Sequence, residues 1–188
     1  MNLPSNISTR LCRVEKYFLV IALMIATIGA VQDLRIRRIP NWLTYSGLLA
    51  ALVIRTVLSG WSGAKSVFAG TAVASGVFLV LYLLKAMGGG DVKLMAAVGA
   101  WAGPSHALVI LVAVSIAGGV LALLYMIFGK LVVKTLRNTL ALFRHHLTSG
   151  FRAHAVLNIE QPASTRLPYG VAIAVGTLYC AASVLWWR

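Results

Sequence analysis

Two aspartates beside apolar sequence are the residues of this chain best suited to do chemistry. Acidic residues are scarce in its 188 positions and number four: Glu15, Asp33, Asp91 and Glu160. Asp91 follows three glycines between two long apolar runs, and Asp33 lies at the end of an earlier apolar run. Placing a carboxylate next to a segment apolar enough to cross a membrane costs free energy. Asp33 and Asp91 therefore call for a functional reason.

Two carboxyl groups in a partly apolar site can activate water. At short distance they cannot both be ionised comfortably, so the pair shares one proton near neutral pH. The ionised member takes a proton from water while the protonated member donates to a peptide carbonyl oxygen, and the roles exchange as the tetrahedral intermediate collapses. Either aspartate could take either role, because the titration belongs to the pair. The alternative from another class is a small proton-coupled membrane transporter, in which the acids bind and release protons.

The glycine triplet before Asp91, residues 88–90, offers a backbone without side-chain barriers. We expect these glycines to have free access to positive φ and to let an extended substrate strand align along them. The simpler alternative is a solvated loop between helices, in which the triplet is only a flexible turn. The two alternatives differ in whether a methyl group is tolerated at these positions.

The composition places both aspartates in a membrane protein. Hydrophobic residues make up 60% of the chain and charged residues 11%, outside the range of a soluble globular domain. We expect an all-α, polytopic membrane helix bundle of about six transmembrane helices, each of roughly 20 residues. The net charge of +13 comes from residues that flank apolar segments, which favours anionic lipid headgroups over nucleic acid as a partner. Cys12 and Cys180 show no metal-ligand spacing, so neither a metal site nor a cofactor is expected.

The chain divides into a polar N-terminal segment, residues 1–16, and a membrane domain, residues 17–187. The expected spans lie at residues 17–33, 41–58 and 66–84, at two stretches of 94–129 divided at 103–106, and at 167–187. Within the membrane domain, residues 130–166 are basic and are expected to form a cytoplasmic amphipathic segment on the membrane surface.

Local signals mark the ends of the first two spans. Pro40 is expected to stop the first helix, and Asn41 can cap the second. Residues 59–63, rich in Ser and Gly, predict the turn that ends the second span. Arg55 interrupts that span, and its head is expected to extend toward the nearer membrane interface.

Alternating crossings bring the two aspartates to one face. The turns after the first, third and fifth spans hold eleven of the seventeen Lys and Arg residues, so the positive-inside bias makes this face cytoplasmic and places the N-terminus outside. Asp33 and Asp91 are separated by two crossings. We therefore expect their carboxyl groups to return to the same face at similar depth and to meet.

Three motifs in order carry a resemblance to a known family. Asp33 is followed by Ile39-Pro40-Asn41, residues 88–91 read as GxGD with the basic Lys93 after them, and Pro168-Tyr169-Gly170 opens the last span. Together they resemble the type IV prepilin peptidases, the bacterial branch of the GxGD intramembrane aspartyl proteases, over residues 17–187.

The resemblance implies an aspartic endopeptidase with Asp33 and Asp91 as its catalytic pair. Gly88 and Gly90, the fixed glycines of GxGD, would lie where the substrate backbone approaches. Four further residues match motif positions with supportive roles: Lys93, Pro168, Tyr169 and Gly170.

The resemblance also implies a substrate and a location. The enzyme would be a multi-pass protein of the bacterial inner membrane that removes the basic leader peptide from prepilins or pseudopilins at the cytoplasmic face, usually just after a glycine. Longer family members carry an N-terminal region with paired CxxC motifs, which this sequence lacks, so it resembles the short form found with tight-adherence (Flp-type) pilus systems. A non-catalytic subunit of pilus or secretion assembly is the remaining alternative, and the oligomeric state stays open.

Overall fold

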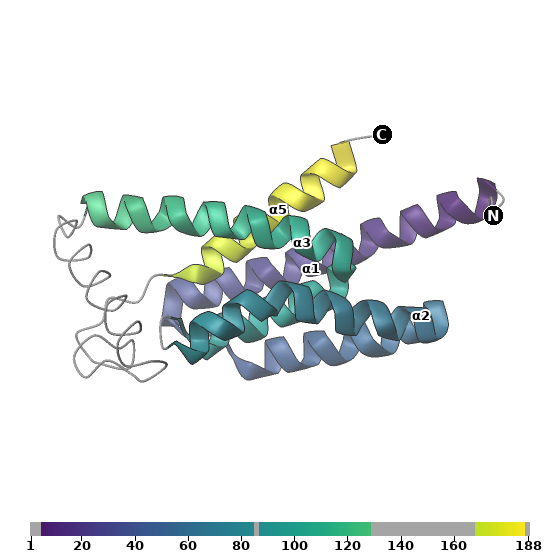
Figure 1. Cartoon of the computed structure of the whole chain (residues 1–188), viewed down its shortest axis with the longest axis horizontal. Coiled ribbons are helices and arrows are strands. Elements are labelled where there is room, and N and C mark those ends of the chain that lie inside the picture. The colour runs from purple at the N-terminus through teal and green to yellow at the C-terminus, as the bar shows by residue number, and fades with distance from the viewer. Residues whose placement is uncertain (1–4, 85–86, 129–167, 187–188) are drawn as a thin grey trace.

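Four helices make up the described part of the chain. The computed structural model describes residues 5–84, 87–128 and 168–186. Their helices are α1 (Ser5–Ile36), α2 (Asn41–Leu83), α3 (Gly89–Phe128) and α5 (Tyr169–Trp186), arranged as a bundle (Figure 1). Each contains a stretch long and apolar enough to cross a membrane. The expected all-α bundle of membrane-type helices is confirmed for these residues, although it has four helices where about six were expected.

α2 folds back on itself at Gly60. A straight helix of 43 residues would be about 65 Å long, yet both ends of α2 lie beside the start of α3. Lys93 Nζ is 2.9 Å from Asn41 Oδ1, and the ring of Tyr82 lies against Gly89. Gly60 has φ 59° and ψ −144°, a conformation that suits glycine and breaks the helix. Figure 1 shows the two arms of α2 side by side.

α3 bends in the same way at Gly103, where φ is 75° and ψ is 169°. The next residue is a proline, which has no N–H and cannot continue the hydrogen-bond ladder of the first arm. That first arm packs against α1, where the side chain of Leu94 fills the space beside Gly29. The second arm packs against α5, where Val114 faces Gly176.

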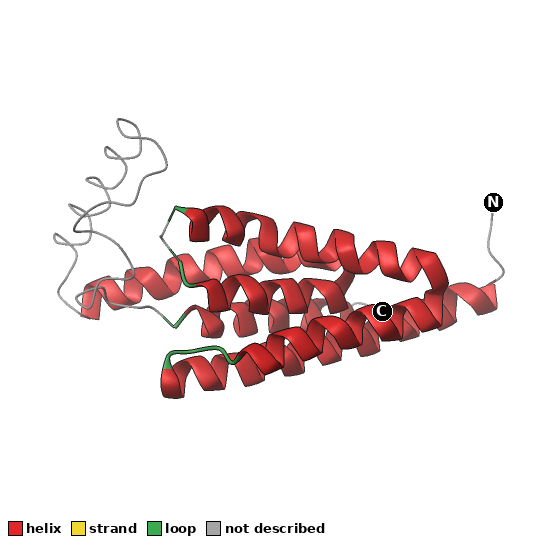
Figure 2. Ribbon diagram, turned by 90° about the horizontal axis from the view of Figure 1, so that it is seen from below, coloured by secondary structure: helices red, strands yellow, loops and turns green. Residues whose placement is uncertain are grey.

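The described loops gather at one end of the bundle. Figure 2 shows them in green: residues 37–40, the stretch around 84 and 87–88, and residue 168. The bends at Gly60 and Gly103 lie toward the other end, within the ranges 59–63 and 103–106 where turns were expected. The end of α1 therefore meets the starts of α2, α3 and α5.

Small residues let the arms of different helices approach closely. Gly70 of α2 lies against the backbone of Gly99 of α3, where an added methyl group would collide with the Gly99 carbonyl oxygen. Trp101 Nε1 donates to the carbonyl oxygen of Gly47 at 2.8 Å. Close backbone contact and hydrogen bonds between helices are typical of helix association in membranes. These contacts join α2 to the arm of α3 that begins beside Asp91.

Arg55 is buried between three helices, at the end of the bundle that holds the bends, and its head binds protein groups there. Its side chain is 3% exposed. It donates to Glu15 Oε1 at 3.0 Å and to the carbonyl oxygens of Trp101 and Ala100 at 2.8 and 3.4 Å. Its guanidinium carbon lies 4.6 Å from the centre of the Phe18 ring.

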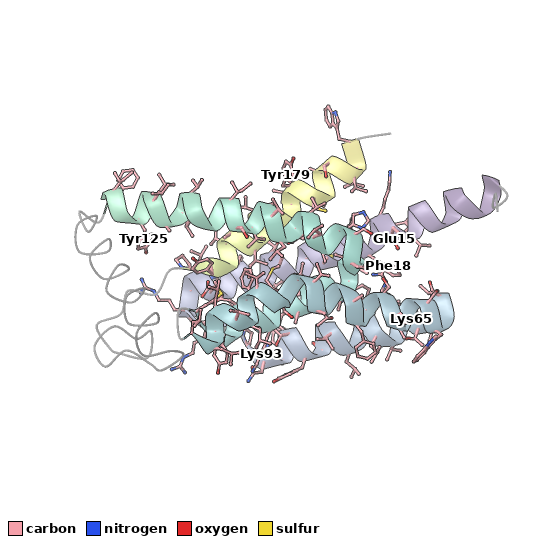
Figure 3. The ribbon with its side chains drawn as sticks, viewed as in Figure 1. Glu15, Phe18, Lys65, Lys93, Tyr125 and Tyr179 are labelled. Carbon is pink, nitrogen blue, oxygen red and sulfur yellow. The ribbon has the colours of Figure 1, made fainter. Side chains whose placement is uncertain are left out.

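The bend in α3 explains why Arg55 is held there. The carbonyl oxygen of Ala100 would accept the N–H of residue 104 in a continuous helix, but that residue is proline. Arg55 supplies the missing donors, and its charge is favourable at the C-terminal end of the first arm. Figure 3 shows Glu15 and Phe18 toward this end of the bundle, away from Lys93.

Two expected segments remain. Residues 5–16 form the first turns of α1 and continue without a break into the apolar part of that helix. The basic segment predicted at residues 130–166 lies outside the described residues.

Candidate active site

Asp33 lies in the last turns of α1, where that helix meets α5. The residue is 8% exposed, although the following residues 34–38 are all exposed. Asp33 Oδ2 accepts the backbone N–H of Gly170 at 2.9 Å. A buried carboxylate needs such a partner, because burial removes its hydrogen bonds to water. α5 therefore both covers this carboxyl group and binds it.

Asp91 is the third residue of α3 and is half-buried. Its backbone N–H donates to the carbonyl oxygen of Gly88 at 3.2 Å, and its carboxylate accepts the backbone N–H of Gly88. A carboxylate at the third position of a helix that binds back to the residue before the helix satisfies an otherwise unpaired donor. The positive end of the helix favours a carboxylate at this position.

The structure brings Asp33 and Asp91 together at the loop end of the bundle. α1 and the first arm of α3 run in opposite directions. Asp33 lies one turn beyond Gly29, and Asp91 lies one turn before Leu94, which contacts Gly29. The two carboxyl groups are close enough for their charges to interact.

Residues 168–170, at the start of α5, form a third side of the site. The ring of Tyr169 lies against Gly118 of α3, and its phenol is close enough to Asp91 for an electrostatic interaction. The next residue is the one whose N–H binds Asp33. This turn therefore reaches both aspartates.

Lys93 contacts the start of α2. Its ammonium nitrogen lies 2.9 Å from Asn41 Oδ1 and 5.1 Å from the centre of the Tyr45 ring. The expectation that Asn41 caps α2 was wrong, because Pro40 is the N-cap and α2 begins with Asn41 itself. The side chain of Asn41 is therefore available to Lys93, a link that the sequence analysis missed. The sequence held one sign of this contact. Lys93 comes shortly after Asp91 and Asn41 comes shortly after Asp33, and the two aspartates were expected at the same end of the bundle.

The glycine triplet does not use positive φ, so that expectation was wrong. Among the described glycines, φ is positive at Gly60 and Gly103. Gly89 and Gly90 lie instead in the first turn of α3. The triplet is thus the packed start of a helix, and its residues are half-buried.

Different neighbours limit the space at each glycine of the triplet. A methyl group would meet Tyr82 Cε2 at 3.2 Å from Gly89, Ile39 Cβ at 3.3 Å from Gly90 and Asp91 Oδ2 at 3.3 Å from Gly88. All three distances are tighter than ordinary van der Waals contact. A side chain at any of these positions therefore requires a neighbour to move.

The arrangement can supply acid and base to a bound water. Among the described residues, no group of three or more His, Cys, Asp and Glu side chains could hold a metal ion. The carboxyl groups available at this end of the described bundle are those of Asp33 and Asp91, since Glu15 lies with Arg55 at the other end. Two interacting carboxyl groups can take and give protons in turn.

One comparison with known proteins shows the family of the chain. Residues 18–123, more than half of the chain, match the sequence model of the type IV leader peptidase family. The match confirms the resemblance carried by the motifs, and its range contains Asp33, Asp91 and Lys93, while residues 168–170 lie beyond it. No curated protein and no solved structure matches the chain significantly.

Proposed function

The chain belongs to the type IV leader peptidase family, and from that membership we propose that it is a membrane-embedded aspartic endopeptidase with Asp33 and Asp91 as its catalytic pair. The observation that carries the proposal is the meeting of these two side chains. They come from different helices and lie at the same end of the bundle, where their charges interact.

Catalysis would use one water molecule between the two carboxyl groups. The ionised carboxyl takes a proton from the water, which then attacks the carbonyl carbon of the scissile peptide bond. The protonated carboxyl donates to the carbonyl oxygen, and the proton on the first carboxyl passes to the leaving nitrogen when the intermediate collapses. The covering by α5 limits access of bulk water to Asp33, which strengthens electrostatic interactions in the site.

The proposed substrates are prepilins or pseudopilins, from which the enzyme removes the basic leader. Membership of a leader peptidase family supports this class. The proposed system is a tight-adherence (Flp-type) pilus, and the proposed location is the bacterial inner membrane. Arg35, Arg37 and Arg38 are exposed at the loop end, which supports a cytoplasmic face in contact with anionic lipid headgroups.

We propose six membrane crossings from the four helices. α2 and α3 would each cross twice, because each folds back at a glycine of positive φ. The first arm of α3 has about 14 residues and is about 21 Å long, shorter than the hydrocarbon core of about 30 Å. With Gly103 near the external interface, Asp91 would lie below the cytoplasmic surface, at a depth suited to cutting a peptide bond at the membrane boundary.

Gly88 and Gly90 are proposed to keep space beside Asp91 for the substrate backbone. At Gly88 an added side chain would approach the carboxylate itself, and at Gly90 it would approach Ile39. The lack of a side chain would therefore keep space free in two places near Asp91: beside its carboxylate at position 88 and beside Ile39 at position 90.

The test is cleavage of a purified prepilin by the protein in liposomes that contain anionic lipid. We expect release of the leader, detected by mass spectrometry, with no proton flux across the same vesicles. Proton flux that depends on Asp33 or Asp91 without cleavage would indicate the transporter instead.

A further inference from the structure

A buried hydrogen bond joins α1 to α5 at one of the two aspartates. Gly170 N–H donates to Asp33 Oδ2 at 2.9 Å, across 137 positions of sequence. Gly170 is buried, as is Asp33. The bond therefore joins one carboxyl group of the pair to the backbone of another helix, away from water.

The bond forms because α5 begins without a local side-chain cap. The first N–H groups of a helix have no partner within it, and a Ser, Thr, Asp or Asn just before the helix usually supplies one. The residue just before α5 is Pro168, whose side chain has no acceptor. Asp33 of α1 takes the place of this local cap, and the positive end of α5 favours its carboxylate.

Glycine is required at position 170 for this approach. A methyl group there would lie 3.0 Å from Asp33 Cβ, 3.1 Å from Asp33 Oδ2 and 3.2 Å from Ala30 Cα. Two of these atoms belong to the backbone or to a Cβ, so rotation of a side chain cannot move them aside. Any substitution must move α5 away from α1 or displace the carboxyl group.

We propose that Gly170 is a positioning residue, whose N–H holds Asp33 Oδ2 and so fixes the orientation of the carboxyl group toward Asp91. With Oδ2 engaged, Asp33 Oδ1 is the oxygen that acts on water. This inference rests on the proposed function. Misplacement of a reacting group by about 1 Å can lower a rate by about a hundredfold, so the effect should fall on the chemical step and not on substrate binding.

The sharpest test replaces the N–H of residue 170 by an ester oxygen, with glycolic acid at this position. The same replacement at Val171 is the matched control, because its N–H donates to the Pro168 carbonyl oxygen in the turn, at 3.1 Å. We expect the ester at 170 to lower kcat by roughly 10-fold to 100-fold with KM within about twofold of wild type. The ester at 171 should stay within about threefold of wild type. An unchanged kcat for the ester at 170, or equal losses for both esters, would overturn the proposal.

A second pair of variants tests the steric argument. Gly170→Ala should also lower kcat at unchanged KM. Gly119→Ala should behave as wild type, because no atom of the described residues, apart from the local helix backbone, lies within 4 Å of a methyl group there. A Gly170→Ala protein with wild-type kcat would contradict the requirement for glycine.

Thermal unfolding in detergent tests the bond without any use of activity. The ester at 170 should lower Tm in the wild-type background and in Asp33→Asn, which keeps an acceptor oxygen, but not in Asp33→Ala. Equal shifts in all three backgrounds would refute the bond. If wild-type protein fails to cleave prepilin, the proposed function fails, while this comparison still decides whether Gly170 holds Asp33.

Discussion

The ammonium group of Lys93 lies 2.9 Å from the side-chain oxygen of Asn41, so the start of α3 is tied to the start of α2. Lys93 is two residues beyond Asp91. Asn41 begins α2, directly after the loop that follows α1, the helix of Asp33. Both partners therefore lie at the end of the bundle that holds the two aspartates. The contact can fix how the two helix starts lie relative to one another.

Loss of either partner in this contact should slow cleavage. We expect Lys93→Met and Asn41→Ala each to lower the rate by roughly 3-fold to 10-fold, because the two helix starts lose a shared constraint. The double variant should be no worse than either single one. Stability should change by less than about 1 kcal/mol, since Asn41 is exposed and Lys93 half-exposed. Lys65→Met, at an exposed position elsewhere on α2, is the control, and additive losses would contradict the link.

Each aspartate alone should be essential for cleavage. Asp33→Asn and Asp91→Asn keep the size of the side chain but remove the exchangeable carboxyl group. We expect each to lower the rate by roughly a thousandfold or more, with the double variant no slower, because the pair acts as a unit. Glu15→Gln is the control for removal of an acidic residue, since Glu15 lies at the other end of the bundle. Near wild-type cleavage by either aspartate variant, at normal membrane level, would disprove the mechanism.

The glycine triplet should tolerate substitution unequally. Gly89→Ala should be mild, because it meets the ring of Tyr82, a long side chain that is 40% exposed and free to move. Gly88→Ala and Gly90→Ala should lower the cleavage rate more. The methyl group at 88 would press on the carboxylate of Asp91, and the one at 90 would press on Ile39 Cβ.

Gly90→Val should be the harshest change in the triplet. It adds a β-branched group beside Ile39, where a methyl group already lies 3.3 Å from Cβ. Processing rates normalised to the amount of membrane protein give the comparison. Equal, near wild-type rates for all three alanine variants would remove this account of the glycines.

Arg55 should matter for stability more than any other charged residue in the described part. Arg55→Met leaves Glu15 and the carbonyl oxygens of Ala100 and Trp101 without their donors. We expect a loss of about 2–4 kcal/mol in the free energy of unfolding, measured by unfolding in detergent. Glu15→Gln should cost less than about 1 kcal/mol, because the Glu15 side chain is 43% exposed. An unchanged stability in Arg55→Met would contradict a structural role for these contacts.

Fusion reporters can test the proposed crossings. A reporter at Gly63, beside the bend in α2, should behave as external, and one after Leu147 as cytoplasmic. This result follows from the excess of basic residues after the first, third and fifth spans. Opposite signals at both sites would reverse the orientation.

The sequence allowed a good prediction of which helix ends meet, because the hydropathy pattern marks the spans and the alternation of crossings assigns each helix end to one face. Asp33 and Asp91 were expected at one face, and the structure brings them to one end of the bundle. Turns were expected around Gly60 and Gly103, and the bends are there. Each bend separates two arms of one helix, so the described part has four helices where about six were expected.

Contacts between helix faces could not be predicted in the same way. The buried position of Arg55 depends on which carbonyl groups the bend at Gly103 leaves unpaired, and no periodicity in the sequence reports that. The conformation of the glycine triplet was misjudged for a related reason. Glycine permits positive φ but does not require it, and here close packing against Ile39 and Tyr82 explains its use.

The bond between Asp33 and Gly170 also sets the order in which the site is assembled during synthesis. Chains are made at about 5–20 residues per second, so the 137 positions between the two residues correspond to a delay on the order of ten seconds. During that interval α1, α2 and α3 can enter the membrane while Asp33 still lacks its partner on α5. The nascent protein therefore lacks this bond until α5 has been made, and the proposed activity would reach its full rate only then.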